Sequence, residues 1–128
     1  VSPMTSNPIR ALTPTAIKYL LTLSQLCAPG KGARCVTVAE RLGVSKPSVH
    51  SMVRNLSALG LVQKEPYGIV YLTGEGRDAA ALYETCYAPL CQRIRETLGL
   101  EEDACINAAC AVLAQVPDQL DELARRLS

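Results

Sequence analysis

The stretch TVAERLGVSKPSVHSMVRNLSALGLV, residues 37–62, decides the fold of this chain. Thr37 and Glu40 have the spacing of a capping box, in which a hydroxyl and a carboxylate satisfy free backbone N–H groups at a helix start. A short helix is therefore predicted over residues 37–42. Gly43 ends it, because glycine adopts a left-handed backbone without a steric penalty.

A second helix is predicted from Lys46 to about Leu59. Ser45 is a favourable N-cap, and Pro47 is harmless in the first turn, where a backbone N–H has no helical partner. One face of this helix is apolar and is expected to pack inward: Val49, Val53 and Leu56. The rest of its surface carries polar side chains: Lys46, Ser48, His50, Ser51, Arg54 and Asn55.

The flanking segments complete a winged helix-turn-helix. Upstream, a Thr-Pro pair opens an amphipathic helix over residues 13–26, and residues 35–36 are extended enough for a small strand. Downstream, residues 61–65 and 69–73 are predicted to form a β-hairpin around a Pro-Tyr-Gly turn. In folds of this kind the second helix of the turn motif enters the DNA major groove, and the wing follows the backbone.

The second half of the chain is predicted to be helical. A long helix is expected over residues 75–95, with Pro89 kinking or splitting it. Residues 101–115 form the next predicted helix, whose many Ala and Cys side chains suit a closely packed or dimeric helical layer. A last amphipathic helix is predicted over residues 118–127.

The predicted fold class is therefore mainly α, with a winged helix-turn-helix followed by a helical dimerisation domain. Three parts are expected. Residues 1–12 form a flexible N-terminal arm, residues 13–74 the DNA-binding domain, and residues 75–128 the helical dimerisation domain.

Composition and motif content argue against several classes of function. The 128 residues carry 13 Lys and Arg against 12 Asp and Glu, a net charge of +1, which excludes a polybasic binder but allows a few clustered cations. The chain lacks both an apolar stretch of ~18 residues and a secretory signal, so no membrane partner and a cytoplasmic location are expected. No enzyme is predicted, because nucleophile and phosphate-loop motifs are absent and the single histidine, His50, has no catalytic neighbour.

The expected contacts with double-stranded DNA come from the polar face of the second helix and from cations around it. Ser45, Ser48 and Ser51 allow a helix N-terminus to approach phosphates closely. The residues expected to add charge or hydrogen bonds to phosphates and base edges are Lys31, Arg34, Lys46, His50, Arg54 and Lys64.

Two runs in this region, VTVAERLGVSKPSVHSMVRNLSALGLV at residues 36–62 and YGIVYLTGEGRD at residues 67–78, carry a family resemblance. They resemble the diphtheria toxin repressor and manganese transport regulator family of metal-dependent repressors. The flanking helices follow the order of that family, so the resemblance covers residues 13–127. It leaves no room for the third, SH3-like domain of the family.

The resemblance implies a homodimer bound to a palindromic operator, with the helices after the wing forming the dimer layer. Ser45, Pro47 and Ser51 occupy positions that lie against base edges in the family. Ser48 and His50 occupy phosphate-facing positions.

The resemblance also implies a divalent metal between the first helix and the dimer domain, and here the chain departs from the family. Most ligand positions are vacant, because they hold Lys18, Leu21, Leu113 and Ala114. Only Cys110 matches a ligand position directly, while Tyr87 and Cys91 stand where the toxin-repressor branch has a His and a Glu. Mn²⁺ and Fe²⁺ favour carboxylate and imidazole donors, so the family site is predicted to be degenerate. A Lys18 ammonium in place of the ion would make DNA binding independent of metal.

Four cysteines allow more than one prediction of what ion or small molecule controls the protein. Cys86 and Cys91 are separated by four residues, as are Cys105 and Cys110, which puts each pair about 140° apart on a straight helix. The favoured interpretation is that they fill apolar space. The alternative is that they bind a metal or respond to a thiol-reactive effector. The cofactor stays unknown, with a divalent transition metal as one candidate.

The predicted function is a sequence-specific transcriptional regulator, with repression favoured. One alternative is a regulator similar to the MarR family, which also sets a winged helix on a helical dimer layer but responds to small molecules or thiol chemistry. The other is a winged-helix module that contacts proteins. Such a module would bind duplex DNA weakly even at low salt, whereas a DNA reader loses affinity steeply as salt rises.

Overall fold

The computed structural model describes residues 12–127. Almost all of the predicted N-terminal arm, residues 1–12, lies outside this range. The chain divides into two compact units, residues 18–80 and a second unit that joins residues up to 17 with residues from 81 onward. The boundary between them falls within the first and the fourth helix, and each unit is described by itself.

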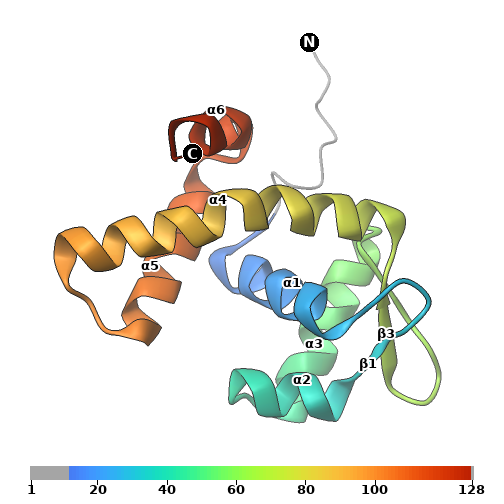
Figure 1. Ribbon diagram of the computed structural model, residues 1–128. Coiled ribbons are helices and arrows are strands. Elements are labelled where there is room, and N and C mark those ends of the chain that lie inside the picture. Colours follow the sequence, from blue (N-terminus) through green and yellow to red (C-terminus); the bar gives the residue numbers. More distant parts are fainter. Residues whose placement is uncertain (1–11, 128) are drawn as a thin grey trace. The chain divides into compact units, whose positions relative to one another are not determined.

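The unit of residues 18–80 contains the winged helix-turn-helix (Figure 1). Its elements in chain order are α1 (Pro14–Leu26), β1 (Ala33–Arg34), α2 (Cys35–Leu42), α3 (Lys46–Ala58), β2 (Val62–Lys64) and β3 (Ile69–Leu72). The strands form one antiparallel sheet in the order β1-β3-β2, with Val62 opposite Leu72 and Ala33 opposite Val70. The predicted hairpin is confirmed, and a third short strand lies on its other edge.

Apolar side chains from all of these helices meet in the core of this unit. Those with almost no exposed surface are Leu20, Leu23, Val38, Val49, Val53, Leu56, Leu61 and Val70. Burial of so many aliphatic side chains is the main term that holds the helices and the sheet together. It fixes which side of each helix remains in contact with water.

The start of α2 differs from the prediction. The helix begins at Cys35, and its N-cap residue, Arg34, makes no side-chain hydrogen bond to it. The predicted capping box of Thr37 and Glu40 is therefore wrong, and the short strand lies two residues earlier than expected, at Ala33–Arg34. The reason is tertiary, because the backbone N–H of Cys35 donates to the carbonyl of Gly68 in the wing, 2.8 Å away.

The second unit is helical in its described part. Helix α4 (Gly74–Leu98) runs into it and is followed by α5 (Glu102–Gln115), a 3₁₀ turn (Pro117–Gln119) and α6 (Leu120–Leu127). Pro89 lies inside α4 without dividing it, so the expectation of a split helix is wrong. Figure 1 shows α4 as one continuous ribbon.

The fold class is thus mainly α, a winged helix-turn-helix followed by helices, as predicted. Within the described part of the chain, no helix is both long enough and apolar enough to span a membrane.

Candidate nucleic-acid interface

Helix α3 begins with a complete N-cap. The Ser45 hydroxyl accepts a hydrogen bond from the backbone N–H of Ser48 at 3.2 Å and donates one to the Ser48 hydroxyl at 2.9 Å. Pro47 lies in the first turn, where it costs no helical hydrogen bond. Ser45 and Ser48 are thus hydrogen bonded to each other at the start of the helix, and both remain exposed to solvent.

The apolar side of α3 anchors it to the core. Val49 and Leu56 have no exposed surface and Val53 has 1%, so the helix cannot rotate without uncovering them. The opposite side is in water. Its exposed residues are Ser45, Lys46, Pro47, Ser48, Ser51, Arg54 and Asn55, and His50 is half-buried. The positions predicted for DNA contact on this helix therefore share one accessible surface.

A side-chain contact joins α3 to the wing. The ammonium of Lys64 on β2 lies 3.2 Å from Nδ1 of His50 on α3. Lys64 has no acceptor sites, so its ammonium is the donor in this contact. Together with Arg54 and Ser57, these side chains line an open cavity of about 510 Å³ whose apolar floor includes Val53.

This cavity was not foreseen from the sequence. Residues 50 and 64 are separated by a turn and a change from helix to strand, so no periodicity connects them. The signal that could have found the pairing is the hairpin register, which sets Lys64 opposite Val70 in β3. Once that register is known, Lys64 can be assigned to the side of β2 that lies next to α3.

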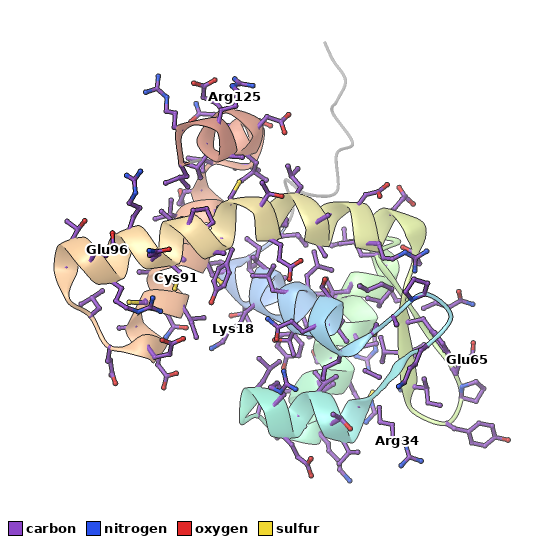
Figure 2. The ribbon with its side chains drawn as sticks, viewed as in Figure 1. Lys18, Arg34, Glu65, Cys91, Glu96 and Arg125 are labelled. Carbon is purple, nitrogen blue, oxygen red and sulfur yellow. The ribbon has the colours of Figure 1, made fainter. Side chains whose placement is uncertain are left out.

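The remaining predicted cations lie near the other edge of the sheet. Arg34 pairs with Ile69 through the β1–β3 ladder, and its side chain is exposed, as Figure 2 shows. Lys31 is exposed in the preceding turn, where its backbone pairs with Ala28.

Across residues 12–127, no carboxylate forms an ion pair with any cation predicted to contact DNA. These cations are Lys31, Arg34, Lys46, Arg54 and Lys64. Their charges are not neutralised within the protein, and they remain available to an anionic partner.

The residues at the family metal positions do not fit Mn²⁺ or Fe²⁺. Lys18 and Leu21 lie on α1, and Leu21 is 95% buried as an apolar side chain. On α5, Leu113 is fully buried, and its neighbour Ala114 offers no donor atom. No group of three or more His, Cys, Asp or Glu side chains in the described residues is arranged to hold a metal ion. Leu21, Leu113 and Ala114 therefore offer no side-chain donor to these ions, and Lys18 offers only an ammonium.

The four candidate cysteines are buried free thiols. Cys86 donates to the carbonyl of Leu120 at 3.2 Å, which explains its place between α4 and α6. Cys91 and Cys105 lie together in a small apolar cluster with Ala109. Cys110 is buried on α5. This burial agrees with the interpretation that the four cysteines fill apolar space.

Comparison with known proteins now gives the class. Residues 11–70 match the family described as iron dependent repressor, N-terminal DNA binding domain. Transcriptional regulator MntR of Escherichia coli O157:H7 is 40% identical over 62 residues, and MntR of Salmonella typhi is 42% identical over 62 residues. The matched segments cover 48% of this chain and 40% of the length of each relative. The chain therefore spans less than half of the length of these relatives.

Solved structures extend the similarity over most of the chain. The manganese regulator SloR superposes with a TM-score of 0.63 at 25% identity, covering 87% of this chain and 54% of that one. The hypothetical protein SSo2273 from Sulfolobus solfataricus covers 91% of this chain and 90% of its own, with a TM-score of 0.58 at 24% identity. The second likeness shows the fold alone.

Fold and matches together define a winged-helix domain similar to those of transcriptional regulators. Residues 11–70 thus resemble the DNA-binding domain of the diphtheria toxin repressor and manganese transport regulator family, as the sequence indicated.

Proposed function

We propose that this chain is a sequence-specific DNA-binding transcriptional regulator that acts as a homodimer on a palindromic operator and represses without the metal control of its relatives. The observation that carries the proposal is helix α3, which is anchored by three buried aliphatic side chains and presents serines and unpaired cations to solvent. The match to a DNA-binding family domain over residues 11–70 supports the same function.

The exposed groups of α3 divide into two roles. Ser45, Ser48 and Ser51 are short enough to let the helix approach the floor of the major groove, where hydroxyls bond either base edges or phosphates. Arg54 and Lys64 flank the cavity beside α3 and carry the charge that a phosphate requires. In this arrangement the helix reads the sequence, and the cavity edge fixes the register of the helix on the backbone.

Exposed apolar residues in the helical unit support a homodimer. Leu98 at the end of α4, Leu100 in the connection after it and Val112 on α5 are 63%, 36% and 39% exposed. A second copy of the chain would cover such surface, and two copies related by a twofold axis would present two α3 helices to successive turns of one DNA face.

The loss of metal control follows from the donor set. Leu21, Leu113 and Ala114 supply no ligand atoms, so a divalent ion has no means of stabilising one arrangement over another at those positions. We expect operator affinity to be the same with added Mn²⁺ and with a chelator, measured on protein shown by elemental analysis to be metal-free. A chelator that abolishes binding would contradict this part of the proposal and leave DNA recognition itself intact.

The test of DNA recognition is duplex binding over a series of salt concentrations, with the preferred sequence first selected from a random duplex pool. For a cation that contacts one phosphate, Arg54→Gln or Lys64→Gln should lower the slope of log affinity against log salt by about 0.9. The matched control is Arg125→Gln, which removes an exposed arginine from α6 and should leave the slope unchanged.

Two results would reject the proposal. Little affinity for any duplex at low salt would favour the protein-contact module. Equal loss of affinity in Arg54→Gln, Lys64→Gln and Arg125→Gln would show that binding is a general charge effect and that α3 has no special role.

A further inference from the structure

Helices α4 and α5 form a hairpin whose two arms carry facing pairs of side chains. Near its closed end, Arg95 and Glu102 form an ion pair of 3.0 Å. About one helical turn further from the connection, Cys91 on α4 and Cys105 on α5 lie in one small cluster of buried side chains. Figure 2 labels Cys91 on this part of α4.

We propose that Cys91 and Cys105 form a hydroperoxide-sensitive dithiol, which is oxidised to an intramolecular disulfide that ties α4 to α5. The site does not depend on DNA binding. It follows from the presence of two thiols on different helices in one cluster, with the Arg95 guanidinium beside one of them.

Cys91 and two neighbouring side chains lie on one stripe of α4. Tyr87, Cys91 and Arg95 are spaced four residues apart, which places them on the same side of the helix. Tyr87 packs against the cluster that holds Cys91, and the Arg95 guanidinium lies 3.9 Å from the Cys91 sulfur. A cationic hydrogen-bond donor thus lies beside this sulfur, and the thiolate is the nucleophilic form of cysteine.

The two cysteines are not equivalent. Cys105 is fully buried and donates to the Leu100 carbonyl at 3.3 Å, and burial raises the pKa of its thiol although the Arg95 charge opposes this. Cys91 retains 5% exposure, and it lies beneath the half-exposed Arg95 side chain. Cys91 is therefore the residue that a small oxidant reaches first, and Cys105 is the residue that resolves the product.

The chemistry needs only a hydroperoxide, ROOH. The Cys91 thiolate attacks the terminal oxygen, the O–O bond breaks, and ROH leaves after taking up the thiol proton, so that Cys91 becomes a sulfenic acid. The Cys105 sulfur then attacks the Cys91 sulfur, an S–S bond forms, and water leaves with the sulfenic oxygen and the Cys105 proton. The two thiols lose two electrons in total, and the peroxide gains them.

The experiment treats the reduced chain with hydrogen peroxide, blocks the remaining thiols and maps cross-linked tryptic peptides by mass spectrometry. Trypsin separates residues 78–93, which hold Cys86 and Cys91, from residues 96–125, which hold Cys105 and Cys110. We expect a Cys91–Cys105 cross-link in a chain that runs as a monomer on a non-reducing gel, reversed by dithiothreitol. Cys91→Ser and Cys105→Ser should abolish it, and the matched control Cys86→Ser, another buried thiol of α4, should retain it.

A rate measurement keeps the test valid if a serine variant fails to fold. The wild-type chain should form this bond faster when native than when unfolded in urea. Arg95→Gln should slow it about two- to tenfold, which corresponds to the loss of one hydrogen bond. A native rate no higher than the unfolded rate, or a dominant cross-link that does not join Cys91 and Cys105, would overturn the proposal.

Discussion

Ser45 shows how one hydroxyl serves local structure at the edge of a binding surface. Its oxygen satisfies the Ser48 backbone N–H, and its own proton goes to the Ser48 hydroxyl. Both groups lie at the helix end where the macrodipole is positive, so the same geometry that starts α3 also favours an anion there.

Ser45→Ala should lower the free energy of unfolding by about 1 kcal/mol, because an N-cap hydrogen bond is lost at an exposed helix end. Urea denaturation monitored by circular dichroism measures the change. Ser51→Ala is the matched control, an exposed serine of the same helix beyond the cap, and it should change stability by less than about 0.5 kcal/mol. Equal effects of the two substitutions would show that the cap contributes nothing.

At the scale of single residues, local chemistry made most of the polar surface predictable. The cap at Ser45 and the buried stripe of Val49, Val53 and Leu56 follow from spacing within one helix, and both are confirmed. The contact between His50 and Lys64 depends on how the hairpin folds back, and nothing in their separation of 14 positions indicates it.

Elements show the same division between local and distant causes. The ends of α1 and α3 were predictable because each depends on a few consecutive residues. The start of α2 was not, because a long-range hydrogen bond from Cys35 to the wing takes precedence over a favourable local cap. The continuity of α4 through Pro89 is likewise a property of what surrounds the helix.

Gly76 determines how closely the first turn of α4 approaches the strand region. A Cβ at this position would overlap the carbonyl oxygen of Leu61, which is backbone and cannot rotate away. Gly76→Ala should therefore destabilise the fold by about 1–3 kcal/mol, as overpacking does elsewhere. Gly74→Ala is the control, since a Cβ there meets nothing within 4 Å. Thermal unfolding of the two variants decides the matter, and equal melting temperatures would contradict the expected clash.

At the scale of the whole molecule, buried titratable groups set the behaviour at alkaline pH. Burial raises the pKa of Cys86 and Cys105 above the usual 9.0 and the pKa of Tyr83 above the usual 10.0. The folded chain therefore retains protons that the unfolded chain releases. The stability associated with these groups is present below about pH 9 and is lost as pH rises toward the folded-state pKa values.

The free energy of unfolding should thus fall as pH rises above about 9. Denaturant titrations at several pH values measure the slope. Cys86→Ala, compared with the wild type, should show a shallower decline, because one of the buried protons is gone. A stability that stays level or increases between about pH 8 and about pH 10.5 would contradict the assigned burial.

The strand order β1-β3-β2 has a consequence for the behaviour of concentrated protein. Because β3 is paired on both sides, the free edges of the sheet belong to strands of only two and three residues, Ala33–Arg34 and Val62–Lys64. Each free edge ends in a cation, and charged, very short edges are poor templates for the addition of another chain. Copies of this chain at high concentration are thereby protected from associating through their own backbones.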